Sequence, residues 1–315
     1  MINFFENKKS SKKITNSVSF KNYKLRKWIP QEKLDFDSLS LNPNAIYLLE
    51  ENMDRINWKY LSSNPNAIHI LEQNMDKINW DYLSVNPNAI HILRKNKDKI
   101  NWSNLSSNPN AINLLKDNKS KINWDKLSAN PNAICILEQN KNKINWDNLS
   151  RNPNAIYLLE TNRDKISWKY LCWNLNGIHL LEQNPDKIYW RWLSFNPNAI
   201  TLLEENLDKI SWSGLSQNLN AISILEKHKN KIDKNWDLIS GLPTAIHLLE
   251  KNKNKINWEN LSKNPNIFVY DFDTIQYGKK NPLSSSSYSK SKNNKSKSKN
   301  RTSSRNKKSK RAIKK

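Results

Sequence analysis

One phrase of hydrophobic and polar residues recurs through most of the chain. Its apolar positions read W-x-x-L, then A-I-x-[LI]-L, then I-x-W, with polar residues between them. The marker tryptophans follow one another at steps of 22 residues, with one step of 24, at Trp58, Trp80, Trp102, Trp124, Trp146, Trp168, Trp190, Trp212, Trp236 and Trp258. A fixed period of this length is typical of stacked repeat arrays, in which each unit contacts only its neighbours. The pattern therefore predicts a repeat domain.

Each unit predicts two short helices, as in residues 56–74. Asn57 suits the N-cap of the first helix, because its side chain accepts a hydrogen bond from a free backbone N–H. The second helix is expected to begin at Asn64-Pro65, since proline is well tolerated at the first helical position. Asn74 is expected to end this helix as a left-handed C-terminal cap.

Asparagine recurs at three positions of the unit, represented by Asn64, Asn66 and Asn74. Capping and turn formation explain all three positions. The alternative is an asparagine ladder that binds the backbone of a peptide ligand.

The core is expected to lie between neighbouring units. Helices this short are marginal in water when isolated, so packing of one unit on the next must stabilise them. We expect the in-register tryptophans to belong to this core, together with the leucine, isoleucine and alanine residues of the phrase.

The two ends of the array are expected to be capped, as solenoid ends usually are. Phe20–Trp28 is predicted as a capping helix that stops before Pro30, and residues 264–275 as a shortened terminal unit. The predicted fold is an all-α solenoid of about eleven 22-residue repeats, each of two short helices, over residues 20–275. Stacking at ~8–10 Å per helix layer predicts an elongated superhelix on the order of 100 Å long.

The net charge of +23 is concentrated at the two ends of the chain. Residues 1–33 carry nine basic and two acidic side chains, and residues 276–315 carry fifteen basic and no acidic ones. Residues 34–275 hold 28 basic and 27 acidic side chains, a net charge of +1. We expect residues 1–19 and 276–315 to be disordered, because they are poor in apolar residues and rich in charge.

The sequence favours a protein without enzymatic activity, cofactor, metal or small-molecule substrate. No nucleophile is paired with a base, and the chain has four glycines and no glycine-rich phosphate loop. Four of the five histidines occupy one repeat position, which we interpret as a variable surface position: His69, His91, His179 and His247.

The cysteines and the hydropathy of the chain indicate an intracellular protein without a membrane segment. Cys135 and Cys172 occupy different positions of their repeats, which predicts free thiols in a reducing compartment. No apolar stretch has the length of a signal peptide or of a membrane-spanning helix.

The full phrase, L-S-x-N-P-N-A-I-x-[LI]-L-E-x-N-x-x-K-I-x-W, resembles the tandem repeat of proteins of unknown function from giant DNA viruses of the mimivirus type. The resemblance covers residues 28–275 and is clear in Leu83–Trp102 and Leu149–Trp168. It implies a viral protein located in the host cytoplasm, with the virus factory, the virion and the nucleus as alternatives. It implies no activity, and the long basic tail departs from it.

The units differ most at the second and fifth positions after the tryptophan. In the seventh and eighth units these positions become aromatic, with further aromatic and arginine residues beside them. The candidate partner-binding residues are Tyr170, Trp173, Tyr189, Arg191, Trp192 and Phe195. Because interface hot spots are rich in Trp, Tyr and Arg, we expect a repeat scaffold that binds an unidentified protein.

The basic tail offers an alternative function, association with nucleic acid. A flexible polycation binds polyanions with steep salt dependence and without sequence preference. The candidate residues for polyanion binding or nuclear import are Arg305, Lys307, Lys308, Lys310 and Arg311. A solvated low-complexity tail without a specific role is the other interpretation.

Overall fold

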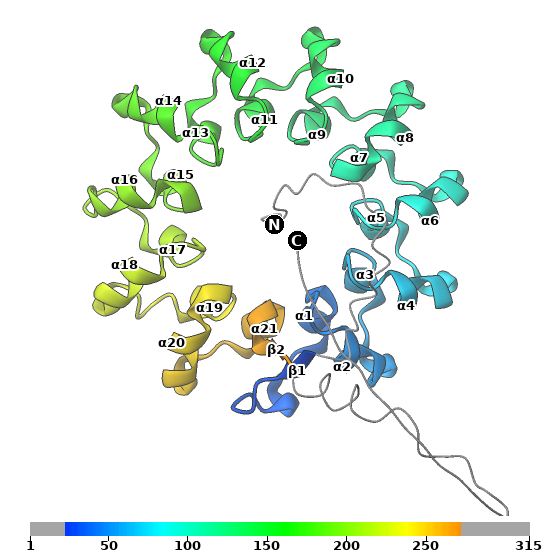
Figure 1. Cartoon of the computed structure of the whole chain (residues 1–315), viewed down its shortest axis with the longest axis vertical. Coiled ribbons are helices and arrows are strands. Elements are labelled where there is room, and N and C mark those ends of the chain that lie inside the picture. Colours follow the sequence, from blue (N-terminus) through cyan, green and yellow to red (C-terminus); the bar gives the residue numbers. More distant parts are fainter. Residues whose placement is uncertain (1–22, 272–315) are drawn as a thin grey trace, which may run out of the picture. The chain divides into compact units, whose positions relative to one another are not determined.

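The structure is a computed structural model that describes residues 23–271. Over this range it contains twenty-one short α-helices and two three-residue strands, which confirms the predicted all-α solenoid. The odd-numbered helices form an inner layer around a central opening, and the even-numbered helices form an outer layer (Figure 1).

The inner helices begin at the repeat tryptophan or, in the first unit, at Phe36. They are α1 Phe36–Leu41, α3 Trp58–Leu61, α5 Trp80–Leu83, α7 Trp102–Leu105, α9 Trp124–Ser128, α11 Trp146–Ser150, α13 Trp168–Leu171, α15 Trp190–Leu193, α17 Trp212–Leu215, α19 Trp236–Ser240 and α21 Trp258–Lys263. The outer helices are α2 Ile46–Glu50, α4 Ile68–Gln73, α6 Ile90–Lys95, α8 Ile112–Lys116, α10 Ile134–Glu138, α12 Ile156–Glu160, α14 Ile178–Glu182, α16 Ile200–Glu204, α18 Ile222–Lys227 and α20 Ile246–Lys251.

The local structure of one unit follows part of the prediction. Asn57 caps α3 as expected, since its side chain accepts a hydrogen bond from the backbone N–H of Tyr60 at 3.2 Å. The outer helix begins only at Ile68, and a 3-10 helix, η4 Met75–Lys77, follows it. The prediction of a left-handed cap at Asn74 is wrong, because its φ is −134°. Its side-chain amide instead donates to the carbonyl of Ile70 at 2.9 Å and so satisfies the end of α4.

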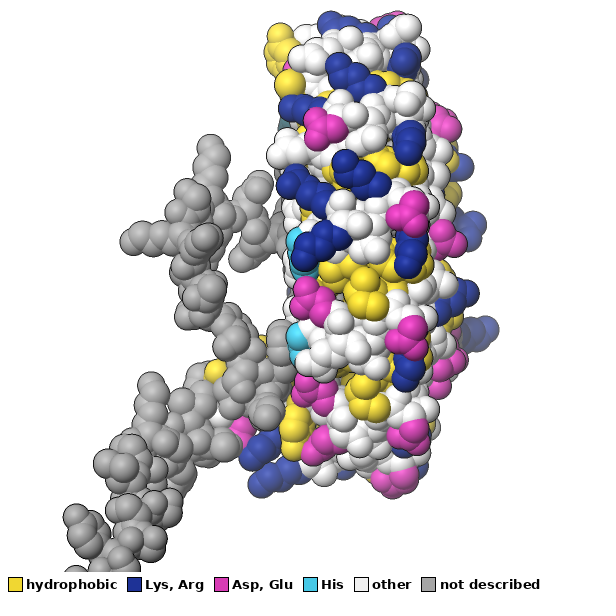
Figure 2. Space-filling view, turned by 90° about the vertical axis from the view of Figure 1, so that its right-hand side faces the viewer, with side chains coloured by type: hydrophobic (Ala, Val, Ile, Leu, Met, Phe, Trp, Pro, Cys, Tyr) yellow, Lys and Arg dark blue, Asp and Glu magenta, His cyan; other side chains and the backbone are white. Residues whose placement is uncertain are grey.

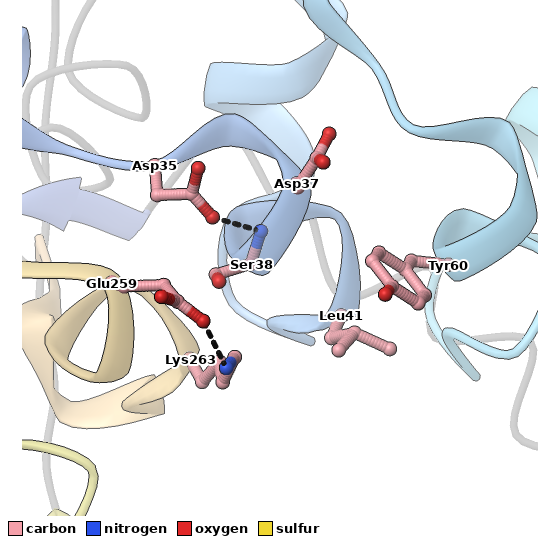
Figure 3. Close-up of a pocket in the computed structure, with 7 residues that line it drawn as sticks. All are labelled: Asp35, Asp37, Ser38, Leu41, Tyr60, Glu259 and Lys263. Atoms are coloured by element: carbon pink, nitrogen blue, oxygen red, sulfur yellow. Dashed lines mark hydrogen bonds and ion pairs between the residues drawn. The ribbon is translucent and has the colours of Figure 1, made fainter.

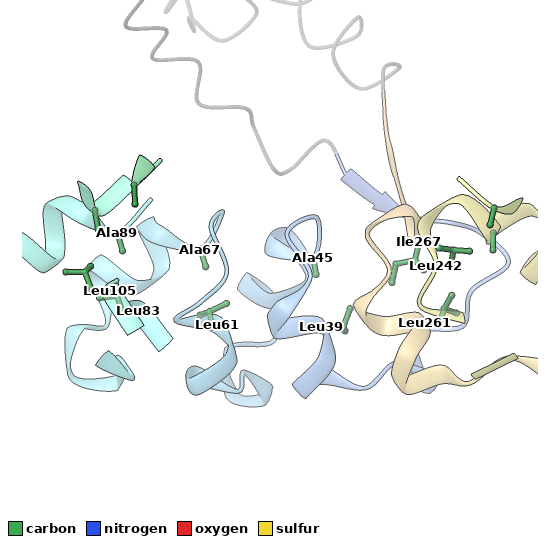
Figure 4. Close-up of a cluster of buried hydrophobic side chains, with 14 of the residues drawn as sticks. Leu39, Ala45, Leu61, Ala67, Leu83, Ala89, Leu105, Leu242, Leu261 and Ile267 are labelled. Carbon is green, nitrogen blue, oxygen red and sulfur yellow. The ribbon is translucent and has the colours of Figure 1, made fainter. Parts of the chain in front are cut away.

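Leucine and alanine residues at equivalent positions form the continuous core, seen in Figure 4. Leu61 and Ala67, for example, are fully buried. The tryptophan rings lie at the edge of this core and are half-buried, with the exception of the buried Trp236. The expectation that they are interior residues therefore holds for one side of each ring only. The other side of Trp58 is covered by Lys77 of η4, at the connection to the next unit, and the Lys77 ammonium lies 4.6 Å from a ring centroid.

A ladder of buried asparagines joins each unit to the one before it. The side-chain amide of Asn64 donates to the carbonyls of Ser40 and Asn42, both at 3.0 Å. Its side-chain oxygen accepts from the backbone N–H of Asn66, whose own amide donates to the carbonyl of Pro43. The same pair of bonds to residues 24 and 22 positions earlier recurs in the later units, except in the unit of α19 and α20, where Leu242 takes the place of the asparagine. Capping alone was thus an incomplete account of this residue.

A buried serine makes the second polar link between units. The Ser62 hydroxyl donates to the carbonyl of Trp58 at 2.7 Å and accepts from the backbone N–H of Asn79 at 3.0 Å. Because the ladder asparagine and this serine have partners for their buried polar groups, the polar core does not carry the cost of unsatisfied groups.

The first and last units contact each other and close the array into a ring (Figure 1). The strands β1 Tyr23–Leu25 and β2 Phe268–Tyr270 pair in antiparallel fashion. Asn42 then donates to the carbonyls of Ser262 at 2.9 Å and Asn264 at 3.0 Å, as each ladder asparagine does toward its preceding unit. We call this junction the seam.

The seam reproduces the other links between units as well. Asn44 donates to the carbonyl of Pro265, and the Ser262 hydroxyl accepts from the backbone N–H of Asp35. Lys33 covers the ring of Trp258 at 5.0 Å. Across the seam, Leu39 and Ala45 of the first unit continue the row of buried apolar residues that ends with Leu261 and Ile267 of the last unit (Figure 4).

Ring closure corrects the expected ends and the expected length. The predicted helix Phe20–Trp28 is wrong in its described part, where Tyr23–Leu25 is a strand. No elongated superhelix forms in residues 23–271, because the rotation from unit to unit adds up to one full turn after eleven units. The two end surfaces bury each other and need no separate caps. The predicted disordered segments, 1–19 and 276–315, lie outside the described residues.

Candidate interaction surface

Three positions of most inner helices face the central opening. They are the first, second and fifth residues after the repeat tryptophan, and we call them the rim positions. The third and fourth residues, such as Leu61 and Ser62, are fully buried beneath the outer layer. At 100° per residue the rim positions lie on the opposite side of the helix, toward the opening. Lys59, Tyr60 and Ser63 are accordingly exposed or half-exposed.

Four of the six candidate residues come together on the rim as one cluster, which we call the aromatic patch: Tyr170, Trp173, Trp192 and Phe195. Trp173 lies at its centre, with ring centroids 4.7 Å from Trp192, 6.3 Å from Phe195 and 6.4 Å from Tyr170. All three pairs meet edge to face, a favoured geometry for aromatic rings. Each of the four residues is half-buried. Helices α13 and α15 thus carry an aromatic surface toward the opening.

The other two candidate residues, Tyr189 and Arg191, are exposed. Tyr189 precedes α15 and is 51% exposed, and neither residue makes a ring contact with the patch. Arg191 occupies a rim position beside Trp192, whereas Tyr189 lies in the connection from the outer layer. The structure therefore supports a common surface for the patch and Arg191, with Tyr189 at its margin.

Two features of this region were not singled out in the sequence. Lys169 lies over the patch, with its ammonium 4.8 Å from the Trp192 ring and 5.7 Å from the Tyr170 ring. A Cβ atom at Gly214 would lie 3.0 Å from the Phe195 ring, so the glycine leaves room for that ring against α17. Once the structure shows which positions face the opening, Lys169 can be identified in the sequence as the rim residue directly before Tyr170.

Two features of the repeat are altered beside the patch: the side-chain caps of the inner helices and the buried serine. Eight of the eleven inner helices have a side-chain cap, and Ser167 before α13, Tyr189 before α15 and Asn235 before α19 provide none. The buried serine of the phrase is replaced by Cys172, and burial raises the pKa of its thiol to about 11, with the backbone N–H of Tyr189 opposing the shift. Such a thiol is a poor nucleophile at neutral pH. A side-chain cap stabilises a helix by about 1 kcal/mol, so the missing caps lower the local stability of α13 and α15.

The patch is electropositive at its border. Arg151, Lys169 and Arg191 occupy rim positions of three successive units, and Asp147 of α11 is the one acidic residue among the nine rim positions of these units. Among residues 23–271, no carboxylate forms an ion pair with any of these three cations. Their charges are therefore free to attract an anionic group on a ligand.

A shallow pocket lies on the rim at the seam, between α21, α1 and α3 (Figure 3). Its lining is mainly polar, with Asp35, Asp37 and Glu259 beside Lys263, which pairs with Glu259 at 3.1 Å. In the part of the chain that the structure describes, no group of three His, Cys, Asp or Glu residues could hold a metal ion.

The repeated histidines take part in contacts between outer helices. Their Nε2 atoms lie 2.7–3.1 Å from a glutamate of the preceding unit, in the pairs His69–Glu50, His91–Glu72, His179–Glu160 and His247–Glu226. On the side of the ring shown in Figure 2, basic and acidic side chains are interspersed. This part of the outer surface offers no extended area of a single charge.

Two further predictions concern a membrane-spanning segment and the basic tail. Every helix in residues 23–271 is too short and too polar to cross a lipid bilayer. The candidate tail residues Arg305, Lys307, Lys308, Lys310 and Arg311 lie outside the described residues.

Known proteins provide no guide to the function of this ring. No protein-family model matches the chain, and neither a curated protein nor a solved structure matches it.

Proposed function

We propose that the protein is a non-enzymatic scaffold that binds another protein through the aromatic patch on its inner rim. The observation that carries this proposal is the clustering of Tyr170, Trp173, Trp192 and Phe195 on two adjacent inner helices. Interface hot spots combine Trp, Tyr and Arg in this way and occupy the centre of a contact surface.

The chemistry of the patch indicates the kind of segment that would bind there. Aromatic rings favour apolar and aromatic side chains, and the free cations beside them favour carboxylates. The indole N–H of Trp173 is buried and has no acceptor among the described residues, so a small rotation would offer it to a ligand oxygen. An apolar protein segment with acidic side chains fits these three features.

Replacing both indoles, as Trp173→Ser with Trp192→Ser, is expected to lower affinity for the partner at least a hundredfold. Loss of two hot-spot residues removes on the order of 3–6 kcal/mol of binding free energy. Quantitative pulldown from the native cell, compared with the parent protein, measures the effect. The matched control is Tyr157→Ser, which removes an aromatic ring that is 71% exposed on the outer helix α12.

A partner recovered equally well by the parent and by the double variant would contradict the proposal. Circular dichroism must first show that the double variant keeps its helical content. This is expected, because neither indole belongs to the fully buried core.

A second candidate function rests on the tail charge of +15 in residues 276–315. We propose as the alternative that the tail binds nucleic acid and tethers the ring to it. Deleting residues 279–315 is then expected to abolish DNA binding, and the affinity of the full chain is expected to fall steeply between 50 and 200 mM salt. Fluorescence anisotropy with a labelled duplex measures both, and DNA affinity retained after the deletion would exclude the tail. The resemblance to giant-virus proteins favours the infected cell as the setting for either function.

A further inference from the structure

The lysine and aromatic arrangement of the patch occurs a second time on the inner rim. The sequence W-K-Y-L stands at residues 168–171 and again at 58–61, and in both cases the next unit has an aromatic residue at its second rim position. In the second arrangement the ammonium of Lys59 lies 5.9 Å from the Tyr60 ring and 5.2 Å from the Tyr82 ring. The corresponding distances from Lys169 are 5.7 and 4.8 Å, so the geometry matches closely.

The rings of the second cluster also contact each other. The centroids of Tyr60 and Tyr82 are 6.0 Å apart, with an interplanar angle of 63°. Both tyrosines are half-buried, and Lys59 is exposed. No carboxylate of residues 23–271 forms an ion pair with Lys59. A free ammonium thus stands over two aromatic rings, as at the patch.

The two clusters lie on opposite sides of the opening. Trp58 and Trp168 are five steps of 22 residues apart in a ring of eleven units. Helices α3 and α5 accordingly face α13 and α15 across the centre of Figure 1. A ligand in the opening is therefore within reach of either cluster.

We propose that Lys59, Tyr60 and Tyr82 form a second binding site for the same class of ligand, an apolar protein segment with acidic side chains. This inference rests on the proposed function. A carboxylate of the segment pairs with the lysine while a neighbouring apolar side chain packs on the rings. The second site is the weaker one, because its fifth rim positions are Ser63 and Val85, where the patch has Trp173 and Phe195.

A protein segment fits the rim better than a nucleic acid does. A strand that passed between the two clusters would meet Asp81, Asp125 and Asp147, which are exposed at first rim positions of α5, α9 and α11. Repulsion by these carboxylates accumulates along a nucleic acid, which carries one negative charge per nucleotide, whereas a peptide with a single acidic residue needs to place only that residue at Lys59.

The test is a peptide-display selection with the full-length chain, carried out in parallel on the parent and on the Trp173→Ser/Trp192→Ser variant. We expect both selections to enrich peptides in which Asp or Glu adjoins Leu, Phe or Trp. Peptides from the variant are expected to bind about tenfold more weakly after a further Tyr82→Ser substitution. They are expected to be unaffected by Tyr157→Ser.

The outcomes separate the second site from the proposed function. If the parent enriches peptides that depend on Trp173 and Trp192 while the variant enriches none that depend on Tyr82, the second site is refuted and the proposed function stands. If neither selection yields peptides that depend on the rim, both fail. Enrichment of basic peptides, or saturable binding of a twelve-nucleotide oligo-dT that Tyr82→Ser removes, would overturn the assigned ligand class.

Discussion

Replacing one ladder asparagine by alanine, Asn152→Ala, is expected to lower the free energy of unfolding by about 2–4 kcal/mol. The side-chain amide of Asn152 donates to the carbonyls of Ser128 and Asn130, at 3.0 and 2.9 Å, in a site without solvent exposure. Its oxygen accepts from the backbone N–H of Asn154. The substitution leaves these buried groups with one partner fewer, and water cannot replace it without opening the interface. Urea denaturation followed by circular dichroism measures the change.

Asn148→Ala is the matched control for this experiment. Asn148 is half-exposed on α11 in the same unit, its backbone N–H donates to the side chain of Asn145, and its own side chain makes no hydrogen bond within residues 23–271. Its replacement is expected to change the free energy of unfolding by less than about 0.5 kcal/mol. Equal effects of the two substitutions would show that the ladder contributes no more than a surface asparagine.

Removing the ladder at the seam, as Asn42→Ala with Asn44→Ala, is expected to open the ring before the helices unfold. The pair makes three hydrogen bonds to the last unit, to the carbonyls of Ser262, Asn264 and Pro265. At about 1–1.5 kcal/mol each, their loss shifts the equilibrium toward the open array by a factor on the order of 10²–10³. Fluorescence energy transfer between dyes on cysteines introduced at Glu32 and Lys263 reports closure, after Cys135, which is exposed, has been replaced by serine.

The internal counterpart is Asn152→Ala with Asn154→Ala, which removes the same three bonds between two units that the chain connects covalently. In urea, the internal variant and the parent are expected to lose energy transfer and helicity at the same denaturant concentration. The seam variant is expected to lose energy transfer at a lower concentration than helicity. Coincident midpoints in the seam variant would refute a seam that is held by the ladder.

The sequence predicted the parts of the fold that depend on residues close together in the chain. The cap at Asn57 and the start of each inner helix follow from local hydrogen bonds, and the all-α repeat follows from the period. The side-chain hydrogen bonds of Asn64 were misjudged because they join residues that are far apart in the chain. Capping is a contact over three or four residues, whereas its amide reaches carbonyls 22 and 24 residues away.

The candidate site shows the same division. The aromatic residues at the second and fifth positions were recognised because they interrupt a repeated pattern. The sequence did not reveal that Trp173 would be central among them or that Lys169 would cover Trp192. The second cluster, at Tyr60 and Tyr82, was also missed. A tyrosine at a variable position carries no signal in the sequence, because only the ring structure shows that these positions all face the central opening.

The sequence by itself determined the unit, its period and the helices within it, because these depend on contacts inside one unit or between successive ones. Only the tertiary structure decided that the array is a ring. Closure depends on a small rotation between units that accumulates over eleven steps, and no single residue encodes it. That rotation brings Asn42 onto Ser262, buries the two ends against each other and turns the rim positions toward a shared opening.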